Sequence, residues 1–500
     1  MWATLGCAAA LLALRLPYLF HPAVWIDEAF SLFHARHSLP LLWGIGWRLE
    51  SSPPLYYTAI WAWTHLFGGA EPVARSLSLL LTLLAAGCVY GAGTSLAGRR
   101  AGAVAAILFL CQPLMFVYSV EIRPYALQVL LIAGAIAALA GALADLGSGR
   151  IRSTTGAISK LAPIVAAAAL ATYTHSTTPV FLAALSGAAA IYGLAQRCSR
   201  VFWLAWFLTN CAALLAVTPQ LLAMLEVIRT NERGIAWIPS PDLKWVLGVT
   251  RSLAIGEFSW NTVMTKLAGC TAVALVTWSA WRLRARRLTL AVGLVLPVLG
   301  LGGLWAASLL QPVLMPRTAL WLVVPLCVLV GCGVSTLQWR GPRFGMLVAL
   351  MVAVFAAMSI INMNNRNNDR PWPRFFAQMA ADARPGDEVV AVDKEVLCVL
   401  DYYAAGEVQR SARRWQLERG PGQAYRSHQR IPLGCNEVAQ LPVEQLPARL
   451  PHGAGLWLLA GDDLQREDIE AVLRGLGTSV TVTRRYEWRN KTLAWRVERQ

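Results

Sequence analysis

Apolar runs of about 20 residues, separated by short polar breaks, recur from the N-terminus to about residue 363. A run of this length can cross a bilayer as a helix, because a helix satisfies its backbone polar groups internally. The pattern therefore predicts about eleven transmembrane helices. We place them near residues 2–20, 71–96, 102–118, 125–146, 160–174, 178–195, 201–222, 262–281, 288–310, 318–337 and 344–362.

The pattern changes after residue 363. Residues 364–375 form a polar linker, and the chain then alternates between short apolar runs and amphipathic stretches. Strands are predicted in PGDEVVAVD, in GLWLLAG and, as a pair, in TSVTVTRRYEWRNKTLAWRV, with helices in KEVLCVLDYYAAG and DDLQREDIEAVLRGLG. The predicted fold class is an all-α polytopic membrane domain over residues 1–363, with outer loops 21–70 and 223–261, followed by a small α/β domain over residues 364–500.

Composition excludes a plain soluble enzyme, since 56% of the residues are hydrophobic and only 14% are charged. The net charge is +16, but the membrane part holds 24 basic and 10 acidic residues, whereas the tail holds 20 and 18. The nearly neutral tail argues against a nucleic-acid partner, because binding such a partner requires a basic face on a soluble domain. The lipid bilayer is the first expected partner.

The basic residues of the membrane part gather in breaks that carry almost no acids, which predicts that these breaks face the cytoplasm. This orientation puts nine of the ten acidic residues outside, Asp145 being the exception. We therefore expect a multi-pass protein of the plasma (inner) membrane whose active face and C-terminal domain are extracytoplasmic. The basic breaks are Arg99/Arg100, Arg150/Arg152/Lys160, Arg197/Arg200, Arg282/Arg284/Arg286/Arg287 and Arg340/Arg343.

The first outer loop carries the clearest candidate chemistry. Asp27 and Glu28 follow the first span directly, and a carboxylate pair at a bilayer face is a site hypothesis, with a solvated surface pair as the alternative. The two prolines at 53 and 54 suit a helix start at Leu55. Tyr56 and Tyr57 are candidate substrate contacts, or else members of an ordinary interfacial aromatic belt.

The other outer segments add cations and one more acid. Glu121 and Arg123 stand in a very short turn, with a structural ion pair as the alternative to a site. His175 lies in the next outer turn, where a capping role is the alternative. Arg317 opens a span, where it could equally be a snorkelling residue, and Arg251 in the long fourth loop is a weaker candidate.

Carboxylates and arginines at a bilayer surface suit the handling of a lipid phosphate. Arginine matches phosphate geometry and stays charged, and a nearby carboxylate can accept a proton from an attacking hydroxyl. This combination favours glycosyl transfer from a polyprenyl-phosphate sugar. The chain contains neither a P-loop nor a dinucleotide fingerprint, so a nucleotide sugar is the less natural donor.

The sequence resembles the GT-C superfamily of integral-membrane glycosyltransferases, in the branch of protein O-mannosyltransferases and lipid A aminoarabinose transferases. The resemblance rests on five segments in the family's order. They are WIDEAFS, SSPPLYYTAIWAWTHLFG, VYSVEIRPYALQVLL, ATYTHSTTPVFL and MPRTALWLVVPL.

The resemblance implies an inverting transferase that uses a polyprenyl-phosphate-linked sugar and an unidentified acceptor of the cell envelope. Asp27 matches the catalytic acid of the first loop and Glu28 its partner. Glu121, with Arg123 and Tyr125 beside it, matches the second acidic turn. Arg317 matches the arginine at the lipid phosphate.

One position departs from this pattern. Many relatives carry His or Lys immediately before the two prolines, and this chain has Ser52 there, so Arg251 or His175 is an alternative source of the missing phosphate contact. A divalent metal between the carboxylates is an open alternative, since some distant relatives use one, although no ligand spacing requires it. No other cofactor is expected.

A multi-pass transporter or flippase of lipid-linked sugars is the alternative function. Such a protein would be expected to carry ionisable residues at mid-membrane and an inverted repeat, and the sequence shows charges at span ends instead. Cys398 and Cys435 in the tail could form a disulfide if the tail is outside, but spacing alone does not decide the pairing.

Overall fold

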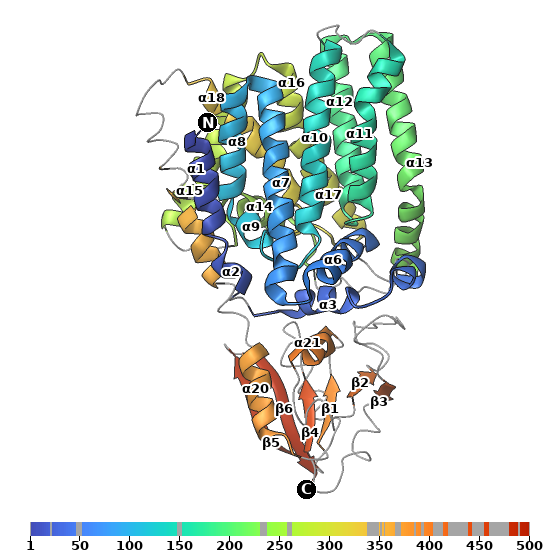
Figure 1. Cartoon of the computed structure of the whole chain (residues 1–500), viewed down its shortest axis with the longest axis vertical. Helices are drawn as coiled ribbons and strands as arrows, with labels where there is room; N and C mark the ends of the chain where they lie inside the picture. The colour runs from blue at the N-terminus through green and yellow to red at the C-terminus, as the bar shows by residue number, and fades with distance from the viewer. Residues whose placement is uncertain are drawn as a thin grey trace. The chain divides into compact units, whose positions relative to one another are not determined.

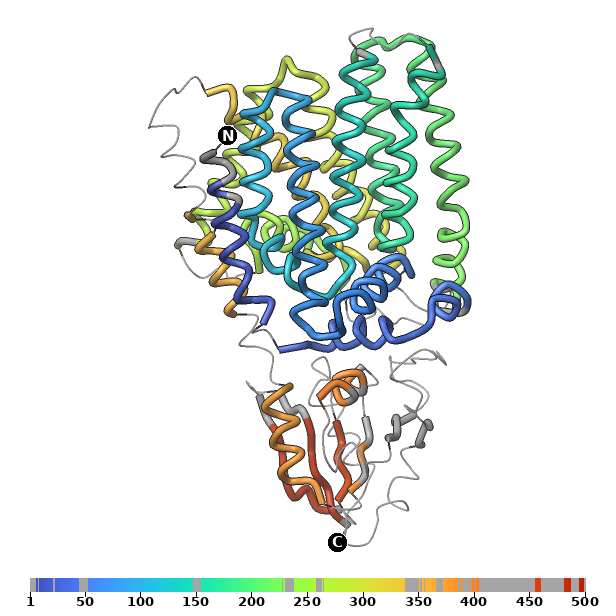
Figure 2. The backbone as a smooth tube through the Cα atoms, in the orientation of Figure 1, coloured from blue at the N-terminus to red at the C-terminus, as the bar shows by residue number. Residues whose placement is uncertain are grey.

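The fold is described from a computed structural model of the whole chain (Figures 1 and 2). The described residues are 2–20, 23–46, 53–147, 153–230, 238–257, 263–337, 350, 353–354, 356–365, 372–384, 387–391, 395–403, 414–418, 439–442, 455–459, 480–488 and 491–499.

The chain forms two compact units. Unit 1 consists of Met1–His21, Ser51–Glu226 and Ile238–Asn365. Unit 2 consists of Pro22–Glu50, Val227–Trp237 and Arg366–Gln500. The division differs from the predicted boundary at residue 363, because part of the first outer loop belongs to the same unit as the C-terminal tail.

Unit 1 is a helical bundle. Figures 1 and 2 show α7 side by side with α10 and, over part of its length, with the shorter α8. Its helices are α1 (Trp2–Ala13), α2 (Pro17–Phe20), α6 (Pro54–Phe67), α7 (Glu71–Ala97), α8 (Arg99–Cys111), α9 (Pro113–Tyr118), α10 (Tyr125–Gly147), α11 (Thr154–Thr172), α12 (Thr178–Gln196), α13 (Arg200–Thr230), α14 (Leu243–Ile255), α15 (Val263–Arg282), α16 (Arg287–Leu290), η2 (Ala291–Val295), α17 (Leu296–Leu310), η3 (Leu320–Leu322) and α18 (Val323–Ser335).

Six helical stretches among the described residues are long and apolar enough to cross a membrane. Helices also occur in most of the other predicted spans, but these are shorter or interrupted. The count of eleven spans therefore stays a prediction. The six stretches are Glu71–Ala97, Tyr125–Leu146, Thr155–Thr172, Thr178–Gln196, Arg200–Glu226 and Arg287–Leu310.

The span predicted at 102–118 is two helices, α8 and α9, because the chain breaks at Gln112. Its backbone is extended, and Pro113 then starts a new helix at its first position. The Gln112 side chain accepts a hydrogen bond from the Met115 N–H (2.7 Å) and donates one to the Leu253 carbonyl (2.7 Å). The break thus ties α9 to α14.

Among the described residues of unit 2, those between residues 23 and 46 form three short helical elements, and those of the tail form a six-stranded sheet with two helices. The loop elements are α3 (Ile26–His34), α4 (Leu39–Leu41) and η1 (Leu42–Gly46). The tail elements are α20 (Trp372–Asp382), β1 (Glu388–Ala391), α21 (Glu395–Tyr403), β2 (Arg414–Glu418), β3 (Ala439–Pro442), β4 (Gly455–Leu459), β5 (Val480–Trp488) and β6 (Lys491–Arg499).

The strand order of the sheet is β3-β2-β1-β4-β6-β5. Strands β1 to β4 pair in parallel, and β6 pairs antiparallel with both β4 and β5. Strand β1 therefore has β2 on one side and β4 on the other, which makes the β1–β4 boundary the point where the strand order reverses direction.

A buried ionic cluster joins the sheet to the turn before β1. Asp387 accepts hydrogen bonds from the Gly455 N–H (2.6 Å), the Trp457 indole N–H (2.9 Å) and the guanidinium of Arg496 (3.1 Å from both Nε and Nη2). Burial would raise the pKa of Asp387, but these hydrogen bonds outweigh it, so the pKa lies below its usual value. Asp387 and Arg496 thus form a charged pair inside the tail.

The structure corrects the sequence interpretation in the tail at three elements. The predicted polar linker ends in α20, whose Trp372, Phe375, Phe376 and Met379 are buried at helical spacing. Strands β2 and β3 were not predicted. The helix predicted at 462–477 lies outside the described residues, as does the first part of the predicted span 344–362, up to residue 349.

Candidate functional site

The turn between α9 and α10 carries Glu121, Arg123 and, at the first position of α10, Tyr125. Glu121 is 1% exposed, and its carbonyl accepts hydrogen bonds from the Arg123 N–H (2.9 Å) and the Ser78 hydroxyl (2.5 Å). The guanidinium carbon of Arg123 lies 6.0 Å from the centre of the Tyr125 ring, which packs edge-on against Tyr118. Hydrogen bonds to the Glu121 carbonyl therefore fix the backbone of this turn, and the turn carries a buried glutamate next to an arginine.

His175 lies in the turn between α11 and α12, outside the predicted spans. It is buried, and its ring is 5.5 Å from that of Tyr125. Its Nδ1 accepts a hydrogen bond from the backbone N–H of Thr177 (3.2 Å) and lies 2.9 Å from the Thr177 hydroxyl. Because a backbone N–H can only donate, the neutral ring carries its proton on Nε2.

Burial, and after it the positive charges of Arg123 and Arg317, lower the pKa of His175 to about 3. The imidazole is therefore neutral near pH 7. The charges of two arginines from separate turns thus affect the pKa of the same buried ring, which links the sequence-predicted residues Arg123, His175 and Arg317.

Hydrogen bonds between the turns connect the predicted segments. The Thr177 hydroxyl donates to the Thr318 carbonyl (3.3 Å), next to Arg317. The Leu55 N–H donates to the Tyr173 carbonyl (3.0 Å) and so joins the start of α6 to the His175 turn. In Figure 1 the starts of α6, α10 and α12 lie at the same end of the bundle.

Tyr56 and Tyr57, the first aromatic residues of α6, are buried, at 1% and 2% exposed, with ring centres 6.0 Å apart. They are thus internal residues rather than members of an exposed aromatic belt. The predicted helix start at Leu55 is confirmed to within one residue, since α6 begins at Pro54.

Arg251 lies on α14, which is connected to two of these segments. Gln112 at the start of α9 donates to the Leu253 carbonyl, as described above, and the indole N–H of Trp245 donates to the Leu314 carbonyl (2.7 Å). Leu314 precedes Arg317 by three residues. Arg251 is therefore on a helix that contacts the Arg317 segment, while Ser52 lies outside the described residues.

Asp27 and Glu28 belong to unit 2 and occupy the first turn of α3. Glu28 is fully buried and Asp27 is half-buried. The Ser31 hydroxyl donates to the Asp27 carbonyl (3.0 Å), which reinforces this turn. Acidic side chains are favourable here, because the N-terminus of a helix carries partial positive charge.

The sequence interpretation missed several polar residues that connect the turns. Gln128 donates to the hydroxyls of Thr177 (3.3 Å) and Thr178 (3.2 Å). Arg15, inside the first apolar run, is 1% exposed and donates to the Ser119 hydroxyl (2.9 Å) and the Leu110 carbonyl (2.5 Å). A lone arginine inside an apolar run was the available signal, since such a charge requires buried partners.

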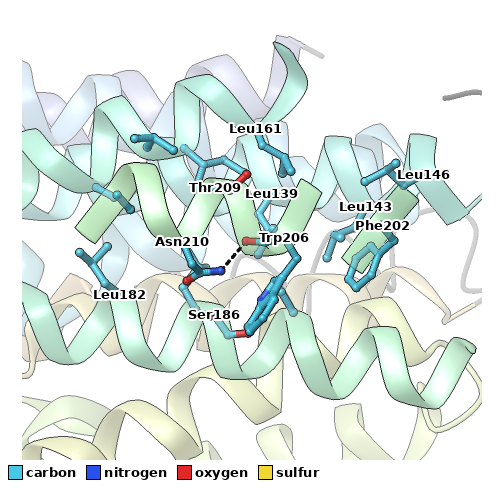
Figure 3. Close-up of a pocket in the computed structure, with 16 residues that line it drawn as sticks. Leu139, Leu143, Leu146, Leu161, Leu182, Ser186, Phe202, Trp206, Thr209 and Asn210 are labelled. Carbon is cyan, nitrogen blue, oxygen red and sulfur yellow. Dashed lines mark hydrogen bonds between the residues drawn. The ribbon is translucent and has the colours of Figure 1, made fainter. Parts of the chain in front are cut away.

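A separate cavity of about 60 Å³ lies among α10, α11, α12 and α13 (Figure 3). Its lining is mostly aliphatic. The Asn210 amide points toward the Trp206 carbonyl, to which it donates (2.8 Å), and Figure 3 shows this bond as a dashed line. Of the described lining residues, none is a sequence-predicted site residue, so the cavity is distinct from the group of Arg123, Tyr125, His175 and Arg317, which we call the turn cluster.

The described residues contain no group of three or more His, Cys, Asp or Glu side chains placed to hold a metal ion.

Comparisons with known proteins bear on the fold. A family model described as dolichyl-phosphate-mannose-protein mannosyltransferase matches residues 51–223. No curated protein matches the chain by sequence.

Three solved structures are similar over most of the chain. ArnT from Cupriavidus metallidurans in the apo state has a TM-score of 0.63 and 14% identity, over 99% of this chain and 97% of that chain. The same protein bound to undecaprenyl phosphate has a TM-score of 0.64 and 15% identity, over 99% and 98%. The oligosaccharyltransferase AglB from Archaeoglobus fulgidus, in complex with an inhibitory peptide and a dolichol-phosphate, has a TM-score of 0.50 and 13% identity, over 82% and 64%.

These matches define the class of fold. The chain has the fold of the GT-C superfamily of membrane glycosyltransferases, and the resemblance in its sequence motifs is confirmed at this level.

Proposed function

We propose that the chain is an inverting glycosyltransferase of the plasma (inner) membrane, which moves a sugar from a polyprenyl-phosphate donor to an extracytoplasmic acceptor. The observation that carries the proposal is the place of the buried His175. Its ring lies beside Tyr125, which Arg123 also approaches, and Thr177 links it by hydrogen bonds to the Thr318 carbonyl, next to Arg317. Two guanidinium groups beside a neutral N–H donor suit a phosphate, because they supply charge and directed hydrogen bonds together.

Two further observations support the proposal. The fold is shared with ArnT, whose structure has been solved bound to undecaprenyl phosphate. Cys398 in the tail is disulfide-bonded, which favours an oxidising compartment outside the cytoplasm. Cys435 lies outside the described residues.

In the proposed reaction, Asp27 accepts the proton of the acceptor hydroxyl as its oxygen attacks the anomeric carbon. The bond from that carbon to the phosphate oxygen breaks on the opposite face, and the prenyl phosphate leaves with the bonding electrons. Arg317 and Arg123 stabilise the charge that develops on the phosphate. His175 adds a hydrogen bond through Nε2–H rather than a charge, since its ring is neutral.

The remaining predicted residues receive supporting roles. Glu28 and Glu121 orient sugar hydroxyls or the arginines. Tyr56, Tyr57 and Tyr125 contact the substrate, and Arg251 is a further candidate for the phosphate.

The test begins with mass spectrometry of envelope glycans from cells with and without the chain, which identifies the transferred sugar. The purified protein in lipid vesicles is then given that sugar on undecaprenyl phosphate, and release of undecaprenyl phosphate is measured. Arg317→Ala should lower kcat by about 100- to 1,000-fold. Asp27→Asn should lower it by about 100- to 10,000-fold.

Asp145→Asn is the matched control, because it makes the same carboxylate-to-amide change at an acid of α10 that pairs with Lys160 of α11 (3.3 Å). Its turnover should equal that of the wild type. Normal turnover in both Asp27→Asn and Arg317→Ala would overturn the assigned roles.

A further inference from the structure

The first-loop helix α3 and the tail helix α21 belong to the same compact unit, although they lie at opposite ends of the chain. Helix α3 carries Asp27 and Glu28 in its first turn. The hydroxyl of Tyr403, the last residue of α21, donates a hydrogen bond of 3.0 Å to the carbonyl of Val24. This bond joins residues that are 379 positions apart in the sequence.

The accepting carbonyl stands at the entry to α3. Val24 is fully buried, and it precedes Trp25, the N-cap residue of the helix. The Trp25 carbonyl accepts the first hydrogen bond of α3, from the Ala29 N–H (2.9 Å). The bond to the Val24 carbonyl holds the peptide group that precedes the N-cap. It therefore sets the direction in which α3 begins, and with it the orientation of Asp27.

Tyr403 is itself held by a column of aromatic rings. Its ring stacks on Phe376 of α20, with centres 6.0 Å apart and planes 17° apart, and Phe376 stacks on Trp372 at 6.0 Å and 27°. Phe375 meets Tyr486 of β5 at 5.7 Å, and Tyr486 meets Trp457 of β4 at 5.3 Å. The ring of Tyr403 is thus held in place by aromatic residues of the tail core.

Helix α21 has a second anchor and a defined place in the fold. Cys398, one turn before Tyr402, is disulfide-bonded. Figure 1 shows α21 beyond the arrowheads of β1 and β4, where the strand order reverses. Open parallel sheets commonly bind their ligands at this edge. In this tail the edge carries a helix that contacts another segment of the same chain.

We propose that Tyr403 is a positioning residue for the reaction, which acts by holding the start of α3 and thereby orients the Asp27 carboxylate. The inference rests on the function proposed above and extends it, because it makes the tail a part of the catalytic apparatus. The chemical step stays with Asp27, and Tyr403 contributes only its hydrogen bond to the Val24 carbonyl.

The test compares Tyr403→Phe with Tyr486→Phe in the full-length protein in lipid vesicles. Both changes remove one phenol hydroxyl from the tail and keep the ring. The Tyr486 hydroxyl bonds Asp382 within the tail, so its loss weakens the tail without touching α3. Turnover is measured with the donor sugar identified as above, and amide hydrogen exchange is followed in residues 23–34 by mass spectrometry.

Tyr403→Phe should lower kcat by about 10- to 100-fold, because a small misplacement of a reacting group has effects of this size. The KM for the donor should stay within about twofold, and the amides at the start of α3 should exchange faster. Tyr486→Phe should keep the wild-type kcat and the wild-type exchange in residues 23–34, even if the tail itself melts earlier.

Unchanged exchange at α3 in Tyr403→Phe would overturn the inference, and so would an unchanged kcat. Asp27→Asn is measured alongside to separate the two proposals. If Asp27→Asn is inactive while Tyr403→Phe is normal, the positioning role fails and the proposed function stands. If Asp27→Asn is normal, the proposed function fails, and the inference that rests on it fails with it.

Discussion

Two buried polar sites, one in each unit, have lowered pKa values for opposite reasons. At Asp387 in the tail, burial opposes ionisation, and hydrogen bonds from Arg496, Gly455 and Trp457 overcome it. At His175 in the α11–α12 turn, burial itself lowers the pKa, and the arginines add to the effect. Asp387 is therefore negatively charged near pH 7, whereas His175 is neutral.

The difference shows that the arginines have different surroundings in the two units. In the tail, the Arg496 guanidinium is occupied by Asp387 and by Glu498, so the arginine stabilises the fold. In the turn cluster, His175 stays neutral near pH 7 and adds no third cation beside Arg123 and Arg317. A protonated ring would add a third like charge to the two arginines, and the neutral ring does not.

The largest expected effect comes from breaking the ionic pair. Arg496→Met leaves Asp387 buried without its cation, and removal of one partner of a buried pair costs about 3–5 kcal/mol. Both side chains are only 4% exposed, so water cannot replace the arginine. The free energy of opening, measured by amide exchange of β4 and β6 in the full-length protein, should fall by this amount.

Asp387→Asn combined with Arg496→Met is the control for this prediction. The double variant removes both charges, so it should recover part of the loss seen in Arg496→Met alone. A loss below about 1 kcal/mol in the single variant would contradict the view that this pair stabilises the tail.

A fall in pH should destabilise the His175 turn and the Asp387 cluster over different pH ranges. The pKa of His175 falls from 6.5 in the unfolded chain to about 3 in the structure, so the unfolded state gains a proton that the folded state lacks between these values. Stability from this group is complete above pH 6.5 and is lost as the pH falls. Between pH 7 and pH 5 the loss should be about 2 kcal/mol.

The tail should lose stability only at a lower pH than the His175 turn. The pKa of Asp387 is below its usual 3.8, so the stability it contributes is complete above that value and is lost as the pH falls through the folded pKa. Amide exchange at pH 5 should therefore rise in the α11–α12 turn and stay unchanged in β4 and β6. His175→Asn, which cannot titrate in this range, should abolish the response of the turn. Equal responses in the two regions would contradict the comparison.

The helical bundle was predictable because apolar runs and proline positions are local signals. The start of α6 at Pro54 and the strand in GLWLLAG both followed from such patterns. The same kind of signal was present for α20 in Trp372, Phe375, Phe376 and Met379, but the asparagines and prolines around it favoured a linker. That error concerned local sequence and was avoidable.

Other features required tertiary structure. The bond from Tyr403 to Val24 joins the two ends of the chain, and no local pattern indicates it. The candidate residues Arg123, His175 and Arg317 could be named from their positions at span ends, but the neutral state of His175 depends on its burial and on Thr177. Sequence therefore identified the residue types of the candidate site, and the structure supplied the protonation state of the histidine.

The smallest expected effect tests the hydrogen bonds that hold the His175 turn. Thr177→Val keeps the shape of the side chain and removes the hydroxyl that contacts His175, Gln128 and the Thr318 carbonyl. The loss should be about 1 kcal/mol, measured by amide exchange of the turn at pH 7. Thr172→Val is the matched control, because the buried Thr172 hydroxyl donates to the Ala168 carbonyl one turn back in its own helix, so its stability should change by less than about 0.5 kcal/mol. If both variants lose the same stability, the hydrogen bonds between the turns contribute no more than a hydrogen bond within one helix. The His175 turn and the ionic cluster of the tail would then differ only in the protonation of their titratable groups.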